Sequence, residues 1–121
     1  MDMDMDMDMD IISLKGGITC IRLRGRLDAP GADAIGIRFS AAAGAAPCRV
    51  VVDLSGVDFI ASLGMRLLIA SARNAKAKNG VMVLVGATAV VHDVLAQMAI
   101  DQIMPIVATE AQALQQARML D

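Results

Sequence analysis

Residues 49–54 read Arg-Val-Val-Val-Asp-Leu, an apolar run with almost no alternation between polar and apolar positions. Such a run is typical of a strand that is covered on both faces, as strands in the middle of a parallel sheet are. Pro47 stops the segment before it, so the run begins as a new element. We therefore expect residues 49–54 to form the centre of a sheet.

The segment before this run predicts a hairpin of two antiparallel strands. Residues 18–27 alternate apolar side chains with arginines, which is the period-two pattern of a strand with one buried face. Residues 11–14 are expected to pair with them, because the glycines in Lys-Gly-Gly at 15–17 accept the positive φ angles of a tight hairpin turn. The sheet therefore begins with an antiparallel pair.

Helices and strands alternate along the rest of the chain, and each expected helix begins at a capping side chain that precedes apolar residues at helical spacing. The helices are expected to begin near Asp28, Ser62, Thr88 and Thr109, the first reaching residue 46, and the strands to cover residues 81–85 and 103–107. Pro105 cannot donate to a sheet, which places the last strand at an edge or a bulge. The predicted fold class is α/β: one domain with a mixed, mostly parallel sheet, an N-terminal antiparallel hairpin and about four helices.

The N-terminus differs in composition from the rest of the chain of 121 residues. Residues 1–10 repeat Met-Asp five times and hold five of the 13 acidic residues. We interpret them as a low-complexity extension that stands outside the fold, so the domain is expected to cover residues 11–121. Outside the repeat, the 11 Lys and Arg outnumber the remaining acids by only three.

Composition excludes several classes of function. Hydrophobic residues make up 56% of the chain and charged residues 20%, so the chain can bury a core and is not intrinsically disordered. Aromatic residues are only 2%, which removes the stacking platforms of single-strand nucleic-acid binders. With so small a net charge outside the repeat, no direct contact with nucleic acid is expected.

Location and cofactors follow from the same kind of argument. The longest apolar stretch, residues 81–91, is too short to cross a bilayer, and the acidic N-terminus lacks the pattern of a secretory signal. We expect a cytoplasmic protein without membrane insertion. Cys20 and Cys48 lie in or beside apolar runs without metal-ligand spacing, so they are expected to be buried, reduced thiols, and no metal or cofactor is expected.

Few residues could support catalysis. His92 is the one histidine and lies off the apolar stripe of its helix, as a solvated surface residue would. Asp53 and Asp58 lie near the end of the central strand, where Asp53 could simply cap a turn at residues 54–56. No phosphate-binding glycine loop, nucleophile elbow or zinc-protease motif occurs, so enzymatic activity is not expected. A small-ligand site near residues 53–55 and 86–88 remains a minor hypothesis.

Ser62 is the most informative polar residue, because it follows three apolar residues and opens a helix. One interpretation is an N-cap, which would contribute about 1 kcal/mol to stability. The other is a phosphorylation site, where a phosphate would add about −1.5 to −2 charges at a helix end that tolerates anions.

A basic stripe on the same helix bears on that choice. Arg66, Arg73 and Lys76 lie beside Met65 and Ile69 on the helical wheel. Such a stripe is either solvated surface or a docking site for an acidic partner, and phosphate beside it would then release that partner.

The sequence resembles STAS domains, especially the small anti-sigma factor antagonists of bacteria. The resemblance covers nearly everything after residue 10. It rests on Leu-Arg-Gly-Arg-Leu-Asp at 23–28, Val-Val-Val-Asp-Leu-Ser-Gly-Val-Asp-Phe-Ile at 50–60 and Ala-Ser-Leu-Gly-Met at 61–65. Residues 80–86 and 95–105 also look like the family.

The resemblance implies a function without chemistry of its own. Ser62 matches the family serine that is phosphorylated by a serine kinase, which doubles as the anti-sigma factor. The unphosphorylated antagonist binds that kinase and frees the sigma factor, phosphorylation ejects the antagonist, and a phosphatase resets the cycle. The partner-binding surface is expected to comprise Asp58, Ile60, Ala61, Leu63, Met65, Arg66 and Ile69.

Two residues depart from the family pattern. The family aspartate before the serine is Ala61 here, and the hydroxyl residue after it is Leu63. These departures favour an alternative, in which the domain is a constitutive adaptor subunit of a membrane transporter or sensory assembly and is not switched by phosphorylation.

Overall fold

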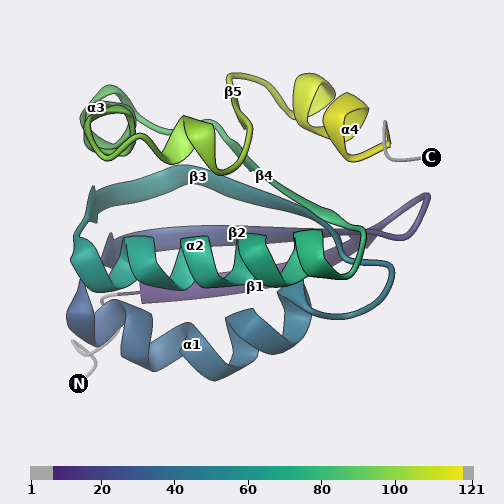
Figure 1. Ribbon diagram of the computed structural model, residues 1–121. Helices are drawn as coiled ribbons and strands as arrows, with labels where there is room; N and C mark the ends of the chain where they lie inside the picture. The colour runs from purple at the N-terminus through teal and green to yellow at the C-terminus, as the bar shows by residue number, and fades with distance from the viewer. Residues whose placement is uncertain (1–6, 119–121) are drawn as a thin grey trace.

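A five-stranded sheet with helices on both faces forms the described part of the computed structural model, residues 7–118 (Figure 1). The strands are β1 (Met7–Leu14), β2 (Ile18–Leu27), β3 (Arg49–Ile60), β4 (Val81–Val85) and β5 (Ile106–Val107). The helices are α1 (Ala29–Ala43), α2 (Ser62–Ala77), α3 (Ala89–Gln97) and α4 (Glu110–Arg118), with a short 3-10 helix η1 (Ile100–Gln102). The strands lie in the sheet in chain order, β1 antiparallel to β2 and all other neighbours parallel, which confirms the predicted α/β fold class.

The core lies on both faces of the sheet. Val50 and Val52 of β3 pack with α1, α2 and α3, while Val51 points to the other face and packs with α4. All three valines are fully buried, as expected for the central strand. The last strand, β5, forms an edge, as Pro105 predicts.

β3 is longer than its sequence predicts. It pairs with β4 only as far as Asp53 but continues beside β2 to Ile60, with two shifts of register. The turn expected at residues 54–56 is therefore wrong, because β2 is long enough to keep pairing with β3 through these irregularities. The Asp53 carboxylate still accepts a local hydrogen bond, from the Ser55 backbone N–H at 2.9 Å.

The Met-Asp repeat contributes to the fold, which corrects the expected domain start at residue 11. β1 begins at Met7, and the side chains of Met7 and Met9 are each only 5% exposed in the core. Strict alternation is itself the pattern of a strand with one buried face, so low complexity did not exclude structure. Residues 1–6 of the predicted extension lie outside the described residues.

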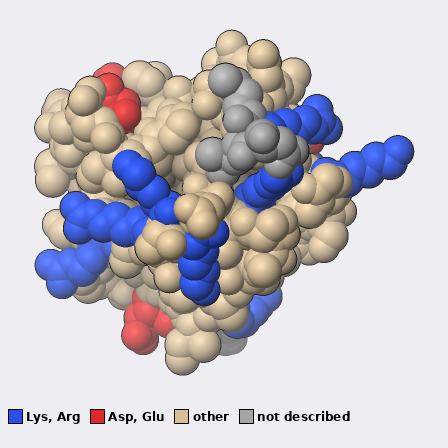
Figure 2. Space-filling view, turned by 45° about the vertical axis from the view of Figure 1, so that its right-hand side comes forward, with Lys and Arg blue, Asp and Glu red and all other residues tan. Residues whose placement is uncertain are grey.

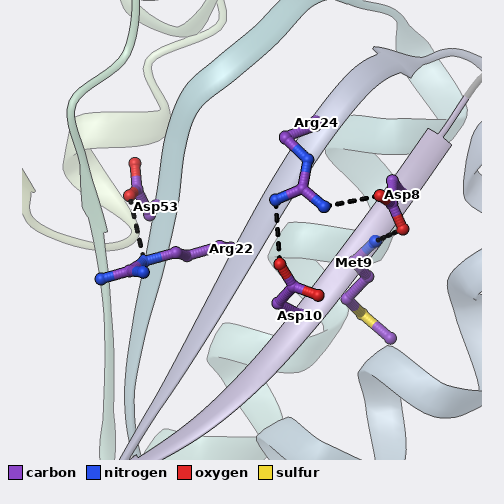
Figure 3. A network of polar contacts seen from close by, with 6 residues as sticks. All are labelled: Asp8, Met9, Asp10, Arg22, Arg24 and Asp53. Carbon is purple, nitrogen blue, oxygen red and sulfur yellow. Dashed lines mark hydrogen bonds and ion pairs between the residues drawn. The ribbon is translucent and has the colours of Figure 1, made fainter.

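The aspartates of the repeat hold β1 to its neighbour from the opposite face. Figure 3 shows Arg24 of β2 between the carboxylates of Asp8 and Asp10, the Asp10 bond being 2.9 Å long. The hydrogen bond from Arg24 lowers the pKa of Asp8 below its ordinary value of 3.8. The pair therefore stabilises the fold above that pH and loses its effect as the pH falls through the lowered pKa.

We expect Arg24→Gln to flatten the acid limb of the stability profile. As the pH falls below 3.8, the urea midpoint of the wild type should decrease more steeply than that of the variant, since only the wild type must protonate an Asp8 whose pKa is lowered by its partner. The effect is expected to be small and to shrink in high salt, because all three side chains are about half exposed. Lys15→Gln is the control, because it removes the same charge in the hairpin turn, away from Asp8 and Asp10, and its profile should follow that of the wild type. Parallel profiles for wild type and Arg24→Gln would contradict the prediction.

Three of the four predicted caps are in place, at Asp28, Thr88 and Thr109. Asp28 accepts a 2.9 Å hydrogen bond from the Gly31 N–H, which lowers the pKa of its carboxyl, and Thr88 caps α3. Thr109 and Gln112 exchange reciprocal hydrogen bonds of 3.2 and 3.1 Å at the start of α4. α1 ends at Ala43 rather than at residue 46, because the chain turns at Gly44 before Pro47.

The predictions for the cysteines hold as well. Cys20 and Cys48 are buried and unpaired. Burial raises the pKa of the Cys20 thiol, which keeps it protonated near neutral pH.

None of the helices within residues 7–118 is both long and apolar enough to span a membrane.

Candidate functional site

The start of α2 holds Ser62 at the surface. Ala61 occupies the N-cap position, and its backbone N–H donates to the Leu27 carbonyl at 3.1 Å. Ser62 is the first helical residue, is exposed, and does not cap the helix. The N-cap interpretation of Ser62 is therefore wrong, because the N-cap position falls on Ala61, directly after the end of β3 at Ile60.

This helix start is favourable for an anion. The first N–H groups of a helix lack partners within the helix, and here no side chain satisfies them. α2 also has no acidic residue in its first turn. A negative charge at Ser62 would therefore meet free N–H donors and the positive end of the helix dipole.

Gly64 fixes this helix start against the sheet. A Cβ atom at Gly64 would lie 2.3 Å from the Leu27 carbonyl oxygen and 2.6 Å from the Leu27 Cγ. Real side chains cannot approach that closely, so only glycine lets α2 begin at this distance from the end of β2. The position of Ser62 thus depends on a glycine two residues after it.

A groove lies next to Ser62, with α2 on one side and Met98 and Ile100, which follow α3 in the chain, on the other. Its volume is about 370 Å³. Its lining combines apolar and cationic side chains and consists of Ser62, Met65, Arg66, Ile69, Arg73, Met98 and Ile100. The structure thus brings together four of the predicted site residues.

Two of the predicted partner-binding side chains are almost completely buried. Ile60 is 4% exposed and Met65 is 7% exposed, and both belong to the core. Ile60 ends β3 with its side chain inward, and Met65 lies on the side of α2 that packs on the sheet, so only its margin reaches the groove. The expectation that these two side chains form an exposed docking surface is wrong.

The remaining predicted residues are accessible to different degrees. Asp58, Leu63 and Arg66 are exposed, and Ala61 and Ile69 are half-buried. Asp58 lies within β3, because that strand continues past residue 54, where the sequence predicts its end. The accessible part of the predicted surface therefore follows the outer side of α2.

Two exposed apolar residues near Ser62 were not predicted as site residues. Met98 follows Val91 by seven residues and Leu95 by three, a spacing that predicts a place on the buried stripe of α3. It is nevertheless 57% exposed, because α3 ends at Gln97 and Met98 leaves the helical path. Phe59 is partly exposed on β3, and the Arg26 guanidinium lies 4.2 Å from the centre of its ring. No sequence signal distinguishes Met98, since its spacing fits the stripe.

Positive charge accompanies this site. No Asp or Glu occurs from residue 59 to residue 92, whereas α2 carries Arg66, Arg73 and Lys76. Figure 2 shows Lys and Arg side chains gathered on one face of the molecule, with the acidic side chains visible there at its margins. An acidic partner is therefore favoured at this face.

The small-ligand hypothesis concerns a separate hollow near the end of β4, of about 190 Å³. Asp53, Ser55 and Gly86 do come together there, with Cys20 and Glu110. Arg22 lies 3.7 Å from the Asp53 carboxylate and 3.9 Å from that of Glu110. Two carboxylates and one already paired arginine make this hollow unfavourable for a phosphate group. Within residues 7–118, no group of three or more His, Cys, Asp and Glu could hold a metal.

Comparison with known families places most of the chain in one of them. Residues 12–108 match the family model described as "Mlab, STAS domain". No curated protein matches the chain in sequence.

Solved structures show the same fold. An anti-sigma-factor antagonist (STAS) domain protein from Planctomyces limnophilus is 25% identical, with a TM-score of 0.79 over 91% of this chain and 97% of that chain. An anti-sigma factor antagonist from Mycobacterium paratuberculosis is 22% identical, with a TM-score of 0.83 over 93% and 94% of the two chains.

Two further structures represent different settings of this fold. The Bacillus cell fate determinant SpoIIAA in its phosphorylated form is 21% identical, with a TM-score of 0.69 over 92% of this chain and all of that chain. The murine anion transporter Slc26a9 is 13% identical, with a TM-score of 0.73 over 94% of this chain but only 22% of the transporter.

Proposed function

Because this chain belongs to the STAS domain family, we propose that it is a partner-switching module of the anti-sigma factor antagonist type. In this proposal it acts in the cytoplasm without chemistry of its own. It binds an anti-sigma factor that has serine kinase activity, and phosphorylation of Ser62 releases it. A phosphatase then restores the binding form. The observation that carries the proposal is the exposed Ser62 at an uncapped helix start beside the apolar and basic groove.

Phosphate at Ser62 would change the surface without unfolding the domain. The added charge of about −1.5 to −2 would be favoured by the free N–H groups of the first turn of α2. Arg66 lies one helical turn further on, at the spacing at which side chains interact. The bound phosphate would oppose any acidic partner that approaches the groove.

The proposal is tested with purified wild type, Ser62→Ala, Ser62→Glu and Ser40→Glu as baits in cytosol from the source organism. We expect wild type and Ser62→Ala to retain a kinase-like protein and Ser62→Glu to lose it. In the presence of labelled ATP, wild type but not Ser62→Ala should become labelled. Ser40→Glu adds the same charge on the exposed side of α1 and should bind as wild type does.

Retention of the same partner by wild type and Ser62→Glu would contradict the switch. A second function is then favoured, in which the domain is a constitutive adaptor of a transporter or sensory assembly. Ala61 and Leu63, which replace the usual neighbours of the serine, support this alternative, as does the likeness to part of the Slc26a9 transporter. The adaptor function predicts that all four baits retain the same transporter or scaffold component.

A further inference from the structure

The groove beside Ser62 has a neighbour on the same side of α2. A second hollow, of about 250 Å³, lies at the C-terminal half of the helix. Its lining is mostly apolar and consists of Ala72, Lys76, Gly80, Val81, Met82, Ile103, Met104 and Pro105. Ile69 and Arg73 in the first hollow lie three residues before Ala72 and Lys76 in this one, respectively, so all four lie along one side of the helix. The opposite walls of both hollows come from the segment 98–105. We call the two hollows together the α2 groove.

The α2 groove has the length of a docked helix. It extends along α2 from Ser62 to Lys76, which at 1.5 Å per residue is about 21 Å, or roughly four helical turns. Its floor and far wall are apolar side chains, of which Met98 is the most exposed. A peptide in a strand conformation would need a free sheet edge, whereas this groove is bordered by a helix and by the α3–β5 segment.

The cations of α2 differ from the arginines of β2 in their partners. Arg22, Arg24 and Arg26 each form ion pairs with aspartate side chains. Within residues 7–118, neither Arg66 nor Arg73 nor Lys76 forms one. The α2 groove is therefore an apolar surface bordered by charges that remain available to a partner.

We propose that the α2 groove receives an amphipathic helix of the partner, whose apolar side chains enter the two hollows and whose acidic side chains pair with Arg66, Arg73 and Lys76. The inference rests on the proposed function for the existence of a partner, and it adds the chemistry of the segment by which that partner binds. Apolar burial supplies affinity, and the charge pairs set the orientation and the salt dependence of binding.

A designed peptide tests this chemistry directly, whichever protein the partner is. The probe is an 18-residue fluorescein-labelled helix with leucines at i, i+3, i+4 and i+7 and glutamates beside them. A matched peptide has lysine at every glutamate position. Fluorescence anisotropy is measured against the full chain and against Arg73→Glu with Lys76→Glu. The matched variant, Lys15→Glu with Arg38→Glu, reverses two exposed charges outside the groove.

We expect the acidic peptide to bind and the basic peptide to bind at least tenfold more weakly. Reversal of Arg73 and Lys76 should weaken the acidic peptide by about tenfold or more, while the matched variant should change its affinity less than twofold. Higher salt should weaken binding to wild type. Far-UV circular dichroism establishes that both double variants are folded.

Several results would overturn the inference. They are equal binding of the two peptides, no binding of either, or equal effects of the two double variants. If the protein binds vesicles that contain anionic lipid but does not bind the acidic peptide, the groove is assigned to a membrane surface instead. This test is independent of the labelling of Ser62. If Ser62 is labelled but the acidic peptide does not bind, the partner docks by a different chemistry. If the peptide binds but Ser62 is not labelled, the groove docks a partner without the phosphorylation switch.

Discussion

Gly64→Ala is expected to lower the free energy of unfolding by more than about 2 kcal/mol, although it adds a single methyl group. That methyl group would overlap the carbonyl oxygen and the side chain of Leu27, both of which are fixed at the buried end of β2. The clash is resolved only if α2 moves away from the sheet, which also displaces Ser62 and breaks the Ala61 bond to Leu27. Urea denaturation of wild type and variant measures the loss.

Gly36→Ala is the matched control for this prediction. Gly36 lies in the middle of α1, and a Cβ there would meet nothing within 4 Å. Alanine should therefore raise the free energy of unfolding by about 0.5–1 kcal/mol, because it is the better helix former. If Gly64→Ala were as stable as wild type, α2 would not be held against Leu27, and the geometry of the Ser62 site would need revision.

Replacement of Met7 and Met9 by alanine is expected to cost at least about 3 kcal/mol of stability. Each side chain is 5% exposed and packs in the main core cluster, so truncation leaves cavities under β1. The cost is expected even though both residues lie in a repeat that resembles a disordered tail. Chemical denaturation of the double variant provides the measurement.

Met98→Ala provides the comparison for the double variant. It makes the same change of side chain at a position that is 57% exposed, so we expect stability within about 0.5 kcal/mol of wild type. Equal stability of wild type and the Met7, Met9 double variant would mean that β1 adds little to the fold. The Arg24 pairs would then act at a strand that is not required.

The sequence predicted those parts of the fold that depend on local patterns. The valine run of β3, the glycine turn before β2 and the caps at Asp28, Thr88 and Thr109 each follow from nearby residues, and all are present. The length of β3 could not be predicted in this way. It depends on continued pairing with β2 through two irregularities, and no local pattern encodes them.

The site was predictable in position but not in the direction of its side chains. Ser62 is at a helix start and near Arg66, as expected. The direction of Ile60 depends on the register of β3 after its two irregularities, and that of Met65 on which side of α2 packs against the sheet. Neither is specified by the local sequence. Met98 shows the same limit, because a residue just after the last helical turn no longer follows the helical period.

The last two Met-Asp units of the repeat form the first half of β1. A unit gained or lost upstream would present the same Met-Asp-Met-Asp sequence before Ile11, with methionines still inward and aspartates still beside Arg24. A repeat that gains a unit should therefore keep the same register between β1 and β2, with the same kinds of side chain on each face of the strand.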